Sequence, residues 1–144
     1  MGLAPAPGPN PAPPRPSDLA DATLHLTVEG LRAPRGTLRL CVWDSAEGFP
    51  ECKPGVNARR IAVKAADETV ELDIESLHSG SYGISIIHDE NDNRRLDKAL
   101  FGLPTEGVGF SNDASAPFGP PSFRRVRFDV AGDTAQTIRL KYYL

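Results

Sequence analysis

The alternation of apolar and polar residues is the feature that most constrains how this chain folds. Leu24, Leu26 and Val28 alternate with polar residues, and six similar runs follow. A period of two is typical of strands that bury one face, and no window of twelve residues carries a helical stripe. The sequence therefore predicts an all-β fold, a seven-stranded antiparallel β-sandwich, with a closed barrel as the alternative. The later runs lie at residues 38–42, 61–63, 70–74, 82–88, 126–130 and 138–142.

One long stretch, residues 89–121, lacks this alternation. Loops of that length inside a compact domain usually carry a function or are ordered by contacts other than secondary structure. We expect one long ordered loop that folds back over an end of the sandwich, with its aromatic residues packed there; a ligand platform is the alternative. Trp43 is expected to be buried beneath it rather than exposed for binding. The aromatic residues in or beside this stretch are Phe101, Phe110, Phe118 and Phe123.

The amino-terminal segment has a different composition from the rest of the chain. Its first sixteen residues hold seven of the fourteen prolines. Proline lacks the amide donor that a sheet requires, so we expect residues 1–21 to form an extended Pro/Ala-rich tether. The alternative is a proline-rich ligand segment. Residues 22–144 are expected to form a single β-sandwich domain.

Charge and hydropathy exclude several classes of partner. The net charge is −3 and no basic stripe is present, so a nucleic-acid partner has no electrostatic support. No run approaches the roughly 18 apolar residues of a membrane span. The first ten residues also lack the basic and apolar regions of an export signal. The chain is therefore either cytosolic or has lost a leader. The tether favours the second, and we expect a periplasmic or secreted protein.

The two cysteines are close in sequence. Cys41 lies in a predicted strand and Cys52 in the loop that follows. An even count without metal-type spacing is typical of an oxidising compartment. We predict a disulfide between them; two unpaired thiols are the alternative.

Acidic and amide side chains are most concentrated directly after the predicted strand that ends in His88. In the loop 89–97, side-chain oxygens fall at the first, third, fifth and ninth positions, and the Arg95 carbonyl falls at the seventh. A hard cation such as Ca²⁺ binds six to eight oxygens, and a chain wrapped around it presents alternate side chains inward. The spacing therefore predicts a calcium-type ion site. Its ligands would be Asp89, Asn91, Asn93, Arg95 and Asp97.

This loop is not an EF-hand. Arg94 stands where that motif has glycine, and Leu100 stands where it has a bidentate glutamate. A later residue, Glu106 or Asp113, is expected to complete the coordination. The alternative is a polar turn without an ion, in which the side chains bond their own backbone and the arginines balance the charge.

His88 has three interpretations: a metal ligand, a general base, or a hydrogen-bonding anchor for the loop backbone, which we favour. Catalysis by a serine requires a histidine within reach and a third group to orient it. No spacing selects Ser85 or Ser111 for that role, and acidic pairs in the loop are too common to indicate a glycosidase. We expect no enzymatic activity. A small hydrolase using His88 and a loop carboxylate is the alternative.

A run of motifs resembles the DUF2141 family, a set of bacterial proteins of unknown function that are usually made with an export signal. The resemblance covers roughly residues 24–142. It implies an exported, periplasmic or surface location and a sandwich of the immunoglobulin or prealbumin-like type, and it supplies no activity. The family's loop typically reads HDENGNGKLD, whereas this chain has Asp92 and Arg94 at its glycine positions. The motifs are Gly36-x-Leu38-x-Leu40, Gly80-x-Tyr82, His88-Asp89-Glu90-Asn91-x-Asn93, Leu96-Asp97, Phe101-Gly102-x-Pro104-x-Glu106-Gly107-x-Gly109-Phe110-Ser111-Asn112 and Phe118-Gly119-Pro120-Pro121-Ser122-Phe123.

These observations favour a non-catalytic function. We expect an exported binding or accessory module for an unknown extracytoplasmic protein or ligand, in which calcium rigidifies the loop and pre-organises its Phe-rich surface. The competing interpretation is a purely structural β-sandwich that binds no ion.

Overall fold

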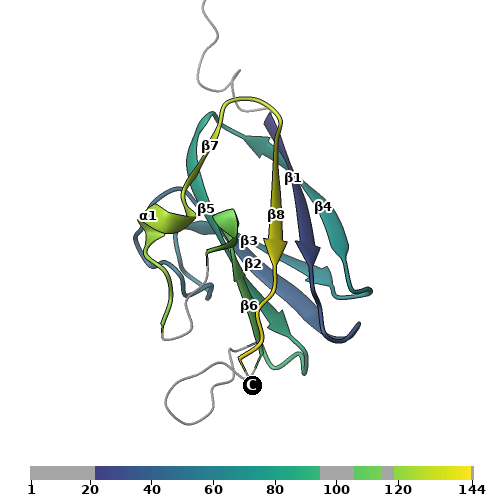
Figure 1. Ribbon diagram of the computed structural model, residues 1–144. Helices are drawn as coiled ribbons and strands as arrows, with labels where there is room; N and C mark the ends of the chain where they lie inside the picture. The colour runs from purple at the N-terminus through teal and green to yellow at the C-terminus, as the bar shows by residue number, and fades with distance from the viewer. Residues whose placement is uncertain (1–21, 95–105, 115–118, 144) are drawn as a thin grey trace, which may run out of the picture.

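Eight strands form two sheets in the computed structural model, which describes residues 22–94, 106–114 and 119–143 (Figure 1). The predicted tether, residues 1–21, lies outside the described residues. The smaller sheet has the order β4-β1-β8, with β1 (Ala22–Glu29), β4 (Val70–Leu77) and β8 (Thr134–Arg139). The predicted all-β architecture of two sheets is confirmed.

The larger sheet has the order β3-β2-β5-β6, with β7 paired to the beginning of β5. All its pairings are antiparallel. Two short helices, η3 (Ser111–Asp113) and α1 (Phe123–Val126), lie between β6 and β7. The strands are β2 (Thr37–Trp43), β3 (Ala58–Lys64), β5 (Gly80–Asp89), β6 (Gly107–Phe110) and β7 (Phe128–Val130).

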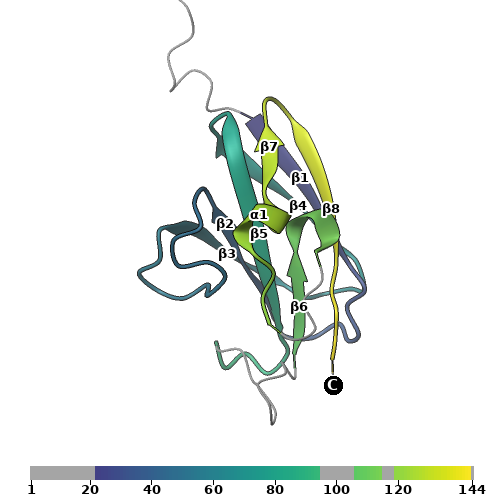
Figure 2. The same ribbon diagram turned by 60° about the vertical axis from the view of Figure 1, so that its left-hand side comes forward.

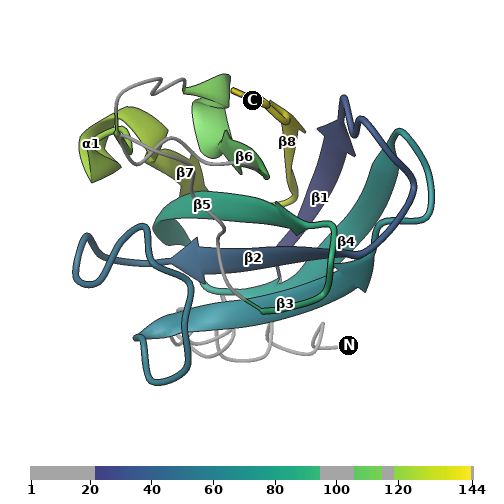
Figure 3. The ribbon, with the colours of Figure 1, turned by 90° about the horizontal axis from the view of Figure 1, so that it is seen from below.

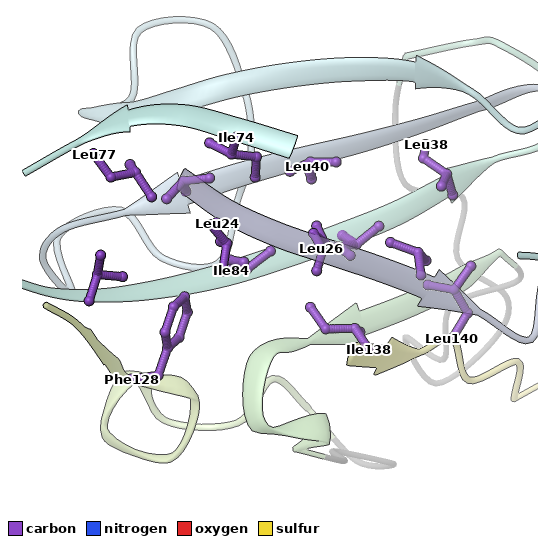
Figure 4. Close-up of a cluster of buried hydrophobic side chains, with 14 of the residues drawn as sticks. Leu24, Leu26, Leu38, Leu40, Ile74, Leu77, Ile84, Phe128, Ile138 and Leu140 are labelled. Atoms are coloured by element: carbon purple, nitrogen blue, oxygen red, sulfur yellow. The ribbon is translucent and has the colours of Figure 1, made fainter. Parts of the chain in front are cut away.

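The apolar positions of the alternating runs form the core between the sheets. Leu24 and Leu26 on β1 face Leu38 and Leu40 on β2, and all four are buried (Figure 4). Fully burying such a side chain stabilises the fold by about 1.5–3 kcal/mol. The period-two signal therefore identified the residues that join the sheets.

The prediction of seven strands is wrong, because β6 lies in the stretch that was expected to be irregular. Its sequence, Gly-Val-Gly-Phe, carries no strand propensity at the glycines. Both glycines are required by close packing: a Cβ at Gly107 would lie 2.5 Å from Tyr142 Cε2, and one at Gly109 would lie 2.7 Å from Ile138 Cγ2. The prediction of purely antiparallel pairing is also wrong, since β1 and β8 run parallel.

The two long sides of the sandwich differ. On one side, the backbone of Val108 on β6 exchanges two hydrogen bonds, of 3.0 and 2.8 Å, with Lys141 just after β8, which joins the sheets. On the other side, β3 ends the larger sheet and β4 ends the smaller one. Figure 3 shows both of these strands away from β6 and β8, each at the edge of its own sheet. Backbone pairing therefore joins the two sheets on the side of β6 and β8, whereas within the described residues no backbone pairing joins β3 to β4.

A second apolar cluster lies outside the core. Trp43 is fully buried, its ring meets Phe49 edge-on with centroids 5.8 Å apart, and its Nε1 donates to Ser85 Oγ at 2.9 Å. Phe110 and Phe123 pack on the Phe49 ring. Trp43 is therefore covered first by the loop between β2 and β3, which projects in Figure 2, and only then by residues of the long stretch.

The structure joins Cys41 on β2 to Cys52 in that projecting loop by a disulfide, with Cα atoms 5.6 Å apart. A closed loop of this size stabilises the folded state by about 3 kcal/mol in the chain-entropy description. The disulfide thus holds Phe49 over Trp43. The phenylalanines at positions 101 and 118 lie outside the described residues.

Candidate functional site

The end of β5 places charged and polar side chains inside the protein. His88 and Asp89 are the last two residues of the strand, and both are fully buried. Glu106 is buried next to them, with 4% of its surface exposed. Buried carboxylates are rare unless they are paired. The partners of these groups therefore determine what this end of the sandwich can do.

Asp89 organises the loop that follows it. Its Oδ2 accepts hydrogen bonds from Arg39 Nε and from the Arg94 amide, both at 2.8 Å. Its Oδ1 accepts from the Asn93 amide at 3.2 Å. Asp92 and Arg94 have φ of 55° and 65°, so the chain turns back at both residues toward Asp89. The described part of this loop is a polar turn that uses its own backbone amides.

Glu90 is held by two arginines from the loop between β1 and β2. Arg32 Nε donates to Oε1 at 2.7 Å, and Arg35 Nη2 donates to Oε2 at 3.0 Å. The Glu90 side chain is 7% exposed. Burial alone would raise its pKa, but the hydrogen bonds and charges of these arginines outweigh burial, and the pKa of Glu90 lies below its ordinary value of 4.5. The carboxylate is therefore ionised at neutral pH.

His88 uses both ring nitrogens within the protein. Nε2 lies 2.7 Å from the Arg35 carbonyl oxygen, which can only accept, so Nε2 carries a proton. Nδ1 lies 2.7 Å from the Tyr142 hydroxyl, which also accepts from the Arg32 amide at 3.1 Å. Burial raises the pKa of Tyr142 above 10.0, and the Glu90 charge raises it further against the opposing effect of Arg32. The Tyr142 hydroxyl can therefore donate to Nδ1, so that both ring nitrogens of His88 are bonded within the protein.

A pH dependence of stability follows from the lowered pKa of Glu90. A carboxyl whose pKa is lower in the folded chain contributes stability above the unfolded value of 4.5, and that stability is lost as pH falls through the folded value. We expect the free energies of unfolding of the wild type and Glu90→Gln, measured in urea, to differ most at neutral pH. The two values should converge as the pH falls through the lowered pKa of Glu90. Glu47→Gln, at an exposed position, is the control. A wild-type advantage that persists or grows on acidification would contradict this assignment.

The predicted ion ligands are only partly brought together. Asn91 Oδ1 accepts from the Asn93 amide at 3.2 Å, and Glu106 Oε2 accepts from the Glu90 amide at 2.8 Å. Asp113 lies apart from the loop and accepts from the Arg139 amide at 3.1 Å. The fourth and fifth ligands, Arg95 and Asp97, lie outside the described residues. In the parts of the chain that the structure describes, no three His, Cys, Asp or Glu side chains converge as a metal-ligand set.

Arginines from outside the loop pair with its carboxylates. The polar-turn alternative has Arg94 and Arg95 balance the charge, and Arg95 lies outside the described residues. Within them, Arg32 and Arg35 pair with Glu90, and Arg39 pairs with Asp89. Sequence reasoning overlooked all three because they are distant in the chain. Arg39 occupies an ordinary polar position of an alternating strand, where charge is usually solvated. The only local signal was the Arg-x-x-Arg spacing at residues 32–35.

The two serines considered as nucleophiles are bonded into the fold. Ser85 Oγ accepts from Trp43 and donates to the Pro50 carbonyl oxygen at 3.2 Å. Ser111 Oγ accepts from the Ile84 amide at 2.9 Å and donates to the Val126 carbonyl oxygen. Both side chains therefore tie the strands to the segments that cover them.

A polar pocket lies at the opposite end of β2 and β5. Its volume is about 260 Å³. Burial, followed by the Asp44 charge, raises the pKa of Tyr82, which lines it. Arg59 crosses it from β3 and donates to the carbonyl oxygens of Glu75 and Ser76 at the end of β4. No local sequence pattern indicates this pocket, because its lining comes from four strands and the loops beside them.

The comparisons with known proteins identify a family. A family model described as "Uncharacterized protein conserved in bacteria (DUF2141)" matches residues 26–139, which run from β1 to the last residue of β8. No curated protein and no solved structure matches the chain. Within the described residues, no helix has the length and apolar character that a membrane crossing requires.

Proposed function

The chain belongs to the DUF2141 family of uncharacterised bacterial proteins, and from this premise we propose that it is a non-catalytic, exported binding or accessory module for an extracytoplasmic protein or ligand. The buried charged network consists of His88, Asp89 and Glu90 with their bonded partners, and it fixes the loop end of the sandwich in one conformation. A surface that is rigid before binding loses less conformational entropy when a partner binds.

One observation carries this proposal. His88, the residue best suited to acid–base chemistry, is fully buried, and both of its nitrogens are bonded to groups of the protein itself. A general base must lie within hydrogen-bond reach of the proton that it removes from a substrate. The position of His88 therefore supports the role of loop anchor over that of catalytic base.

Export is supported by the disulfide between Cys41 and Cys52. Such bonds persist in oxidising compartments and are rare in the cytosol. We therefore propose that the protein works in the periplasm or outside the cell, and that its sandwich is of the immunoglobulin or prealbumin-like type.

The calcium site is the alternative form of this proposal. It would need the oxygens of Asp89, which already accept three hydrogen bonds. The Arg39 guanidinium at 2.8 Å would also oppose a bound cation. We therefore propose that arginines, in place of calcium, neutralise the loop. The two arrangements predict different responses to calcium.

Variants of His88 test the anchoring role. We expect His88→Ala to lower the free energy of unfolding by about 3 kcal/mol, because it opens a cavity and removes the imidazole partner of the Tyr142 hydroxyl and of the Arg35 carbonyl. His88→Gln, whose amide can still reach the Arg35 carbonyl, should lose less. His25→Ala is the matched control: this exposed histidine is paired with Asp73 on β4, and its loss should cost under about 1 kcal/mol.

The same variants distinguish the hydrolase alternative. Wild type and variants are assayed together against esterase, peptidase and glycosidase substrates. A wild-type turnover that disappears in a stably folded His88→Ala protein would contradict the proposal.

A further inference from the structure

We propose that two copies of the chain form a two-fold symmetric dimer, with β4 of each copy paired to β3 of the other. The contact would be made through the open side of the sandwich, which is the side that ends in β3 and β4. This inference goes beyond the proposed function, because it concerns neither the loop end nor its ligand.

The open side is where strand pairing remains available. β3 and β4 each have a neighbour on one edge only, whereas the opposite side of the sandwich is joined through Val108 and Lys141. An exposed strand edge presents amide and carbonyl groups that can pair with another chain. Arg59 on β3 donates to the carbonyl oxygens of Glu75 and Ser76 on β4, which links the two edges at one end. The open side therefore presents two edges held by one side-chain bridge.

The side chains along this side are apolar toward the core and incompletely covered. Ile61 and Val63 on β3, with Val70 and Leu72 on β4, pack against the core but remain only partly buried. Their inward orientation follows from the register, which places Ile61 opposite Leu40 and Leu72 opposite Leu26. A second copy would complete their burial.

Charge selects how two copies pair. The outward face of β3 carries Arg60 and Lys64, and the outward face of β4 carries Glu71 and Glu75, all four exposed. None of the four forms an ion pair with another described residue. Like charges directly opposite each other destabilise a strand pair, and opposite charges stabilise it. Pairing β3 with β3, or β4 with β4, is therefore disfavoured, and pairing β3 with β4 is favoured.

Two-fold symmetry produces this pairing twice. A two-fold axis that runs parallel to the strands along the open side places the smaller sheet of one copy in the same layer as the larger sheet of the other. In each of the two layers, β4 of one copy therefore meets β3 of the other. Because β3 and β4 run in opposite directions (Figure 1), the new pairs are antiparallel. The spacing of the charges also matches. A register that places Glu71 opposite Lys64 of the second copy also places Glu75 opposite Arg60 of that copy.

The test is the mass of the full chain in solution, measured by sedimentation velocity over a range of concentrations. We expect the wild type to be dimeric at micromolar concentration. Glu71→Lys/Glu75→Arg should be monomeric, and so should Arg60→Glu/Lys64→Glu. Mixing the two variants should restore a dimer of one copy each, because each new strand pair then carries opposite charges. Glu47→Lys/Glu51→Arg changes the net charge equally on the loop between β2 and β3, and should remain dimeric.

Two results would overturn the proposal. One is a wild type that stays monomeric at every concentration. In that case the edges of β3 and β4 would be available to pair with an extended peptide of another protein. The other is a dimer that both charge-reversed variants still form. The mixing experiment guards against misfolding, since only folded variants can restore each other's pairing.

Discussion

Replacing Asp89 by alanine should lower the free energy of unfolding by about 3–5 kcal/mol, the cost of removing one partner from a buried ion pair. Asp89 is fully buried and accepts from Arg39, Asn93 and Arg94. Its removal leaves the part-buried Arg39 without that carboxylate and releases the two loop amides. Urea denaturation at neutral pH, monitored by Trp43 fluorescence, measures the loss.

Asp92→Ala is the matched control for this prediction. Asp92 lies in the same loop and carries the same charge, but its side chain is 58% exposed, and its nearest Arg39 nitrogen is 3.8 Å away. An exposed pair of this kind contributes about 0–1 kcal/mol. Equal losses for the two variants would show that loop charge, in place of burial at Asp89, governs stability.

The second large effect is expected at Gly36, just before β2. Its φ is +75°, and a Cβ there would lie 2.2 Å from the Asp89 carbonyl oxygen and 2.6 Å from Glu90 Cα. These are backbone atoms that cannot rotate away. We expect Gly36→Ala to destabilise the fold by about 3 kcal/mol, from positive-φ strain together with overpacking. Chemical denaturation measures this loss as well.

Gly55→Ala separates the two causes. Gly55 has a similar φ of +89°, but no atom lies within 4 Å of the position that its Cβ would take. This control should lose only the conformational part, about 1 kcal/mol. A Gly36→Ala protein as stable as Gly55→Ala would mean that the loop after β5 does not pack against Gly36.

The sequence predicted the core better than the site, for a physical reason. Burial of one strand face repeats along the chain, so Leu24, Leu38 and Ile84 are recognisable from their neighbours alone. The strand β6 escaped prediction because Gly107 and Gly109 are specified by distant contacts with Tyr142 and Ile138. The parallel pairing of β1 with β8 joins the two ends of the domain, which no local pattern indicates.

At the loop, local spacing identified the important carboxylates but not their partners. The spacing predicts that the oxygens of Asp89 bind calcium. In the described residues these oxygens accept hydrogen bonds from Arg39 on β2 and from loop amides. Glu90 is bonded by arginines 55 and 58 residues away. An ion site and an arginine network require the same acidic residues, so the sequence alone left both open.

Thermal unfolding of the metal-stripped chain in EDTA and in millimolar Ca²⁺, alongside Asp89→Ala, tests whether arginines and amides hold the loop after β5. A ligand at 100 times its Kd stabilises the native state by about 2.7 kcal/mol, which is several degrees in Tm for a domain of this size. We expect Tm values that agree within about 1 °C in the two buffers, and an Asp89→Ala protein that is destabilised equally in both. A calcium-dependent rise of several degrees that Asp89→Ala abolishes would contradict it and establish the ion site.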